Sequence, residues 1–181
     1  MKGYFGSDVA VDHHGKVIAI AAYDQAAYIY KIQNGAAKLT QTIKTNDTQV
    51  EFAFSIALSG KAEWLAIGIP SGKIVNVYNG VTGAFVLTDI LAENLEYFGY
   101  DVAFTYNGTV MAASAILTNY TGVVLMYVGE EGLYKVTQIL QPAEYKNQQQ
   151  MFGLAIDIGE TANQCLIGAP FITSTYYFVL N

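Results

Sequence analysis

Four segments of this chain repeat one pattern, and this repeat constrains the fold more than any other feature. Each segment opens on a Phe, and an apolar run closes on a small residue 16 positions later. The opening residues are Phe5, Phe52, Phe98 and Phe152, and the small residues are Ala21, Gly68, Ser114 and Gly168. The openings lie 47, 46 and 54 residues apart. A period of about 20 to 50 residues indicates a repeat architecture in which each unit is one supersecondary motif.

Each unit is predicted to hold four short strands. The first two are apolar throughout, which indicates burial on both faces, and a turn such as Asn107-Gly108 joins them. The third and fourth strands alternate apolar and polar side chains, as half-buried strands do. The third strands are expected at 27–30, 74–78, 123–127 and 176–179, and the fourth at 38–43, 85–90 and 134–139. Residues 143–150 are interpreted as a polar loop.

Four-stranded units of about 45 residues, with apolar inner strands and more polar outer strands, are typical of propeller blades. We therefore predict an all-β fold in one domain, residues 1–181, with blades at about 1–50, 51–96, 97–150 and 151–181. It is a β-propeller of four four-stranded antiparallel blades, of which the last lacks its outer strand. Three arrangements stay open: a four-bladed ring with one short blade, a piece of a larger ring, and a ring completed by a partner copy.

The unit boundaries resemble a known family. Phe-Gly opens units one, three and four, Gly168-Ala169-Pro170 follows the second strand of unit four, and Gly68-Ile69-Pro70 nearly matches it. These motifs resemble FG-GAP repeats, the blades of the integrin α-subunit propeller, over the whole chain. The resemblance implies a propeller used for adhesion, lectin-like binding or assembly. Family members bind calcium through Asp-rich loops between the first two strands, but no such loop here supplies three spaced carboxylates, so we expect no metal and no cofactor.

Composition excludes several classes. The nine basic residues are all Lys and face 15 acidic ones, for a net charge of -6, so the basic surface of a nucleic-acid-binding protein is missing. No apolar run reaches the roughly 18 residues of a membrane span. The single Cys165 lies in an apolar strand and is interpreted as an inert thiol. His13 and His14 are interpreted as neighbours in a solvated turn rather than metal ligands.

Two of the four units have an Asp at the same position of the first strand. Asp8, Ser55 and Asp101 stand three residues after the repeated Phe, where unit four has Ala155. In a four-bladed ring the two Asp residues would face each other and share a cation or a water. The competing and favoured interpretation is that each accepts backbone N–H groups where its own strand begins.

These features favour a non-enzymatic propeller that binds a protein partner or a second copy of itself, as a homo-oligomer. Pairing is expected along the last strand, 176–180, unless residues 145–150 or the amino-terminal residues cover it. A lectin-like, carbohydrate-binding propeller is the alternative, and a propeller enzyme is disfavoured because Arg is absent and neither His is on an inner strand. Candidate sugar platforms are Tyr23, Tyr100, Tyr106 and Tyr120. Glycosylation sequons at Asn46, Asn107 and Asn119 favour an extracellular or cell-surface protein.

Overall fold

The fold is all-β, as predicted, in a computed structural model that describes residues 4–45, 51–130, 132–142, 149–161 and 163–179. Its strands form four antiparallel sheets in which each strand pairs with the next along the chain. Sheet 1 contains β1 (Tyr4–Val11), β2 (Val17–Tyr23), β3 (Ala26–Gln33) and β4 (Ala36–Ile43). Sheet 2 contains β5 (Ser55–Leu58), β6 (Trp64–Ile69), β7 (Ile74–Asn79) and β8 (Val86–Ala92).

The second half of the chain repeats this arrangement. Sheet 3 contains β9 (Phe98–Phe104), β10 (Val110–Ile116), β11 (Gly122–Glu130) and β12 (Leu133–Leu140). Sheet 4 contains β13 (Ile156–Ile158), β14 (Gln164–Ala169) and β15 (Ser174–Val179), so it has three strands, as predicted. Short 3-10 helices, η1 (Pro70–Gly72) and η2 (Pro170–Ile172), follow the second strands of sheets 2 and 4 only.

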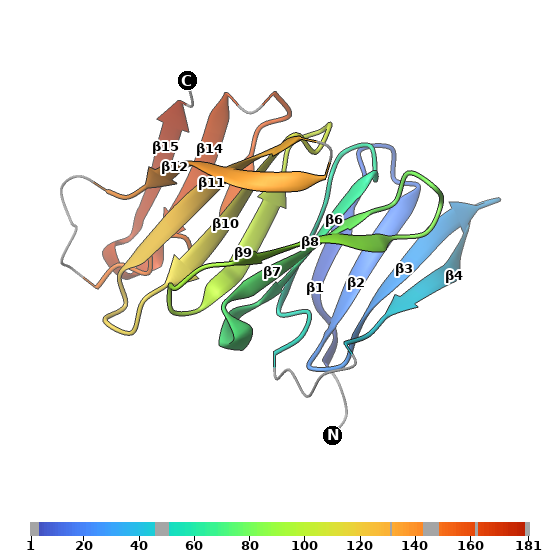
Figure 1. Ribbon diagram of the computed structural model, residues 1–181, viewed down its shortest axis with the longest axis horizontal. Helices are drawn as coiled ribbons and strands as arrows, with labels where there is room; N and C mark the ends of the chain where they lie inside the picture. The colour runs from blue at the N-terminus through green and yellow to red at the C-terminus, as the bar shows by residue number, and fades with distance from the viewer. Residues whose placement is uncertain (1–3, 46–50, 131, 143–148, 162, 180–181) are drawn as a thin grey trace.

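The sheets lie side by side in chain order, from the blue amino-terminal sheet to the red carboxy-terminal one (Figure 1). β5 packs on β1 and β2, β9 packs on β5 and β6, and β13 packs on β9 and β10. We call each packed surface between consecutive sheets a seam. Each seam holds one apolar cluster, built from the facing sides of two sheets. Alternation explains this, because successive side chains of an inner strand face the preceding and the following sheet in turn.

Small residues close the second strands because the next sheet comes very near. A Cβ built on Gly68 would lie 2.1 Å from the carbonyl oxygen of Gly99 in the next sheet. Ala21 and Ser114, at the equivalent places in sheets 1 and 3, are fully buried. The fixed 16-residue offset in the sequence therefore marks the point of closest approach at each seam.

The two outermost sheets each keep one face exposed. Large apolar side chains lie open on β1 at one end of the row and on β14 and β15 at the other. These two faces are thus not packed on each other within one chain. β15 is the edge strand of its sheet, as expected, while most of the 145–150 segment proposed to cover it lies outside the described residues.

Candidate functional site

The inner strands begin at one end of the row of sheets, and aromatic side chains gather there. Tyr4 and Tyr23 of sheet 1 have ring centroids 6.1 Å apart, and Tyr23 lies 5.8 Å from Phe54 at the start of sheet 2. Phe54 in turn lies 4.8 Å from Tyr100 of sheet 3. We call these four residues the aromatic row. It connects three sheets along one rim, because the repeat brings equivalent positions to the same end.

A pocket of about 330 Å³ continues the aromatic row between sheets 3 and 4. Three tyrosines, Tyr97, Tyr100 and Tyr120, share its lining with Ile116, Leu117, Thr118 and Met151. Tyr97 and Tyr120 are each nearly half exposed, and the Tyr120 ring lies 5.9 Å from Phe171. We call this the rim pocket. It offers exposed aromatic faces on an apolar floor, a surface that suits a ring-shaped ligand.

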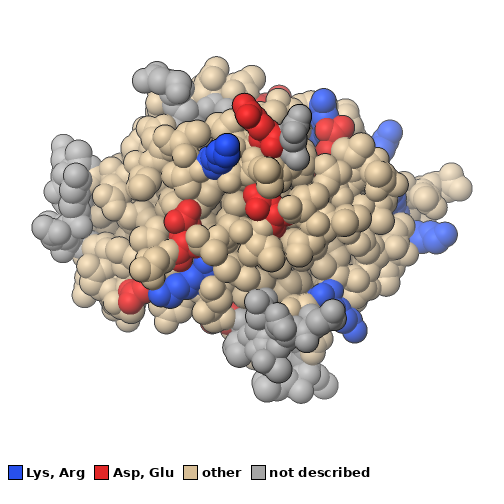
Figure 2. All heavy atoms as spheres, in the orientation of Figure 1, with Lys and Arg blue, Asp and Glu red and all other residues tan. Residues whose placement is uncertain are grey.

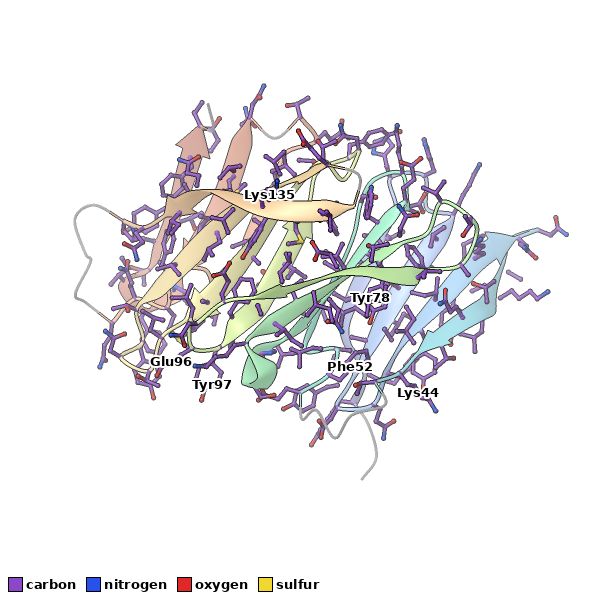
Figure 3. The ribbon with its side chains drawn as sticks, viewed as in Figure 1. Lys44, Phe52, Tyr78, Glu96, Tyr97 and Lys135 are labelled. Carbon is purple, nitrogen blue, oxygen red and sulfur yellow. The ribbon has the colours of Figure 1, made fainter. Side chains whose placement is uncertain are left out.

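Two side chains of opposite charge, Glu96 and Lys73, lie near the rim pocket and interact with each other. Glu96 Oε2 accepts a hydrogen bond from the Thr118 N–H at 2.7 Å, and this bond lowers the pKa of Glu96. Glu96 and Tyr97 lie next to each other on the link from β8 to β9 (Figure 3). None of the described residues that line the pocket is Lys or Arg. The lining of the pocket is therefore made of uncharged side chains.

The inner-strand carboxylates each join their own sheet to the next one. Asp8 Oδ1 accepts the N–H of Val9 at 2.8 Å, and its Oδ2 accepts the N–H of Ile56 in sheet 2 at 2.7 Å. Asp101 does the same with Val102 at 2.9 Å and with Ile156 of sheet 4 at 2.6 Å. We call this two-oxygen arrangement a carboxylate bridge. It confirms that the two Asp accept backbone N–H groups, and it adds a bond to the next sheet that the sequence did not predict.

The seam between sheets 2 and 3 uses different residues. Ser55, at the Asp position of sheet 2, donates its hydroxyl to the Gly99 carbonyl oxygen at 3.0 Å. The carboxylate bridge comes from the outer strand instead, where Asp89 Oδ1 accepts the Ile90 N–H at 2.9 Å and Oδ2 accepts the Tyr134 N–H at 2.9 Å. Sheets 1 and 3 thus share the inner-strand Asp, whereas sheet 2 has Ser55 and sheet 4 has Ala155 at that position.

Burial perturbs the rim carboxylates. It raises the pKa of Asp101 to about 7, with the nearby negative charges of Asp8 and Asp157 acting in the same direction. Burial also raises the pKa of Asp8, although its two N–H bonds oppose the effect. Among the described residues, no group of three or more His, Cys, Asp or Glu side chains is placed to hold a metal ion.

The predicted turn residues lie at the opposite end from the rim. His13 and His14 occupy the β1–β2 turn, as predicted, with their ring planes at 82° to each other. His13 Nδ1 lies 3.2 Å from Glu160 of sheet 4, and its ring contacts Tyr106 of sheet 3 at 5.2 Å. Tyr106 is thus separated from Tyr23, Tyr100 and Tyr120, which do gather at the rim. The β1–β2, β9–β10 and β13–β14 turns therefore lie close to one another at this end.

The remaining candidates from the sequence are Cys165 and the three asparagines of the sequons. Cys165 is buried, and burial raises its pKa to about 11, which keeps the thiol protonated. Asn107 and Asn119 are exposed in turns, where each side-chain oxygen accepts bonds from the Thr two residues later. Asn46 lies outside the described residues. The use of these sequons stays a prediction.

Sequence reasoning missed most of the rim pocket. Tyr97, Thr118 and Met151 come from connections between or within units, where the repeat is irregular and no spacing can be compared. The one available signal was Tyr97 itself, an aromatic residue directly before the repeated Phe98.

Solved structures with this fold are about twice as long. The chain superposes on a protein from Bacteroides uniformis named a "putative 6-phosphogluconolactonase", with a TM-score of 0.73 and 10% identity over 96% of this chain and 50% of that one. A Lactobacillus plantarum protein gives a TM-score of 0.70 and 19% identity, over 96% and 53%. Hydrazine synthase of Kuenenia stuttgartiensis gives 0.70 and 8%, over 99% and 47%. The chain thus spans about half the length of these structures.

No protein-family model matches the chain, and no curated protein matches its sequence. None of the three structures is named for FG-GAP repeats, so that resemblance stays a prediction. None of the helices in the described residues is long and apolar enough to cross a membrane.

The expectation that the chain is not an enzyme is contradicted. Structures of the same propeller-like fold include one named for a lactonase and one named for hydrazine synthase. The exclusion was wrong because it rested on the absence of Arg and of inner-strand His, and carboxylates and tyrosines can also transfer protons.

Proposed function

We propose that the chain is a propeller-type binding module and that the rim pocket is its ligand site. The observation that supports this most is the pair of half-exposed tyrosines, Tyr97 and Tyr120, over an apolar floor of about 330 Å³. Exposed aromatic side chains beside polar groups are the usual surface for stacking a neutral ring. The ligand class that fits best is a neutral carbohydrate.

The polar groups around the pocket support that choice. Thr118 and Tyr120 bring hydroxyl groups to the lining, and Glu96 beside it is an acceptor for ligand hydroxyls. The uncharged lining of the pocket favours a neutral ligand over an ion. A protein partner is the wider possibility that the same aromatic surface supports, because Tyr is enriched where proteins bind each other.

The binding test is a titration of the ¹⁵N-labelled chain with neutral mono- and disaccharides, followed by NMR. We expect the amide signals of Tyr97, Thr118 and Tyr120 to shift, and Tyr120→Ala to weaken binding about tenfold, since aromatic anchors dominate such sites. Val86→Ala is the control, because Val86 is an exposed apolar residue on β8 that lies outside the pocket and outside both end sheets. Unmoved rim signals, or equal losses in both variants, would count against the proposal.

A second candidate is acid–base catalysis at the rim, supported by the pKa of Asp101 near 7. Both oxygens of Asp101 already accept backbone N–H groups, which favours the binding role. Asp101→Asn separates the two, because a binding module keeps its affinity for the saccharide in this variant. An enzyme would lose turnover of a bound ligand while retaining its binding. Extracellular location stays a prediction that rests on the sequons.

A further inference from the structure

The exposed face of sheet 1 is the same surface that sheet 3 buries. Counting from the repeated Phe, the residues at three matching positions are Phe5, Val9 and Val11 in β1, and Phe98, Val102 and Phe104 in β9. In β1 they are 57%, 61% and 59% exposed, whereas in β9 they are 0%, 5% and 8% exposed. β9 buries them against sheet 2. The face of β1 therefore has the side chains of a seam and no sheet to pack on within its own chain.

Sheet 4 has the opposite half of that seam. Leu166 and Tyr177 match Ala66 and Val77 of sheet 2 at a spacing of 100 residues. The sheet 2 residues are fully buried against sheet 3, but Leu166 is 47% exposed and Tyr177 is 57% exposed. Val179 on the same strand is also exposed. An apolar face with no cover thus lies at each end of the row of sheets.

A hollow on sheet 4 matches the seat that holds the start of β9. In the seam between sheets 2 and 3, Gly99 lies so close that a Cβ built on it would be 2.7 Å from the Ile74 oxygen and 3.2 Å from the Gly68 Cα. The matching residues of sheet 4, Gly168 and Ser174, line an open hollow of about 450 Å³. The seat is present in sheet 4, and no Phe-Gly segment of this chain occupies it.

The segment that fits this hollow is at the other end of the same molecule. Gly6 matches Gly99 in sequence position, and the two have nearly the same left-handed backbone, with φ of +84° and +88°. A Cβ built on Gly6 would meet nothing within 4 Å. Gly6 therefore already has the left-handed φ that Gly99 has in its docked position.

Sheet 4 also has a carboxylate on β13, two residues after the position that Asp8 and Asp101 occupy in their units. Asp8, Asp89 and Asp101 each accept one N–H from their own strand and one from the next sheet. Asp157 Oδ1 accepts the Ile158 N–H at 2.9 Å, and no second donor for Asp157 lies in the described part of the chain. Its other oxygen is thus available to a backbone N–H of an incoming sheet.

We propose that two copies of this chain associate head to tail, with β1 of one copy packed on β14 and β15 of the other. Phe5-Gly6 of each copy enters the hollow beside Gly168 and Ser174 of its partner. The new seam repeats the one already present between sheets 2 and 3. The two end segments have opposite net charges, because residues 1–50 contain five Lys and four Asp, whereas residues 151–181 contain Asp157 and Glu160 and no Lys.

The curvature of the row of sheets limits the assembly to two copies. A head-to-tail contact builds a ring when the rotation closes and a filament when it does not. The chain superposes on one half of longer propeller-like structures with a TM-score of 0.73, so its four sheets have the curvature of a ring about twice its length. Two copies therefore close a ring through two identical seams.

The test uses one lysine variant for each open face. Val9→Lys places a charge on the β1 face, and Tyr177→Lys places one on the β15 face. Val86→Lys is the matched control, because Val86 on β8 is 58% exposed, as Val9 is 61% exposed, and belongs to neither end sheet. All three positions are exposed in the single chain, so the variants keep its fold, which circular dichroism checks. Leu166→Lys is a second variant of the sheet 4 face.

Sedimentation velocity on the 181-residue chain at tens of micromolar gives the readout. We expect the wild type and Val86→Lys to sediment as dimers, and Val9→Lys and Tyr177→Lys each to lose association at least about tenfold. Mixing these two variants restores a one-to-one dimer through the seam that neither mutation touches. Only a head-to-tail contact predicts this rescue.

Three outcomes would overturn the proposal. A wild-type monomer at these concentrations assigns the open faces to further sheets of a longer polypeptide. Loss of association in Val9→Lys alone indicates pairing of two β1 faces, and unchanged dimers in all variants indicate pairing along the β15 edge. None of these outcomes bears on the rim pocket, so failure here leaves the saccharide titration as a separate test.

Discussion

The seam between sheets 2 and 3 makes a quantitative prediction for Gly68→Ala. The added Cβ would lie 2.1 Å from the Gly99 carbonyl oxygen and 2.2 Å from Ser55 Oγ. The Ser55 hydroxyl can rotate away, at the cost of its bond to Gly99, but the Gly99 oxygen belongs to the backbone. β9 must therefore move, and the apolar cluster of the seam must move with it.

The expected cost is that of overpacking a core, about 1–3 kcal/mol, plus about 1 kcal/mol for the lost Ser55 hydrogen bond. For a domain of this size, about 3 kcal/mol corresponds to a fall in Tm of roughly 6–12 °C. Urea denaturation followed by the fluorescence of Trp64, which packs against this seam, measures the change in unfolding free energy directly.

Gly168→Ala is the matched control, because Gly168 is the equivalent residue of sheet 4. There the nearest atom to an added Cβ is the Ala155 oxygen at 3.6 Å, an ordinary contact. At concentrations where the chain is monomeric, we expect its unfolding free energy to change by less than about 0.5 kcal/mol. Equal effects of the two substitutions would refute the claim that sheets approach closely at one seam and leave the equivalent face open.

Two further predictions concern buried ionisable groups. The folded state raises the pKa of Asp101 from 3.8 to about 7, so between these pH values the folded protein holds a proton that the unfolded chain has lost. The free energy of unfolding therefore falls as pH rises between about 4 and 7. Asp101 accounts for on the order of 4 kcal/mol of that fall. Asp101→Asn should therefore make the unfolding free energy, measured by urea titration, depend less on pH. An unchanged pH dependence in this variant would show that the pKa of Asp101 is not raised in the folded state. Cys165 should react with a maleimide only as fast as the chain unfolds, because the thiol is buried and protonated, and fast labelling in native buffer would contradict its placement.

Much of the architecture follows from local patterning. The repeated Phe and the small residue 16 positions later mark where sheets touch, so the number of sheets and their strand order follow from the sequence. Alternation placed the third and fourth strands, and the strand count of sheet 4 followed from its missing fourth segment.

The contacts between sheets could not be predicted from the sequence. The bond from Asp8 to Ile56 joins residues 48 positions apart, and nothing in the local pattern distinguishes a carboxylate that reaches the next sheet from one that binds its own strand. The rim pocket depends on connections of unequal length, including those that carry Tyr97 and Met151. The exposure of the open faces could not be predicted from the sequence either. Phe5 and Phe98 have similar neighbours in the sequence and differ in whether another described sheet packs on them.

The charged side chains on the surface bear on how the protein recognises a ligand or partner. On the face drawn in Figure 2, Lys and acidic side chains are scattered singly among uncharged residues, and no large patch of one sign is visible. Charge therefore contributes little directed binding there, and the aromatic and apolar surfaces carry the recognition argued above. Phe52 and Tyr78, labelled in Figure 3, are both buried in the seam between sheets 1 and 2, so they are not part of that recognition surface.

The central claim is that the four sheets leave sheet 1 and sheet 4 unpacked against each other within one chain. The most direct test is pulsed electron resonance between spin labels at Val9→Cys and Tyr177→Cys, with the labelled chain diluted in unlabelled chain so that only distances within one molecule are measured. A distance between the two labels well over the spacing of packed sheets, which is about 10 Å, is the predicted result, whether the chain is a monomer or a dimer. Labels at about that spacing would show that one chain closes its own four-bladed ring, and would contradict the account.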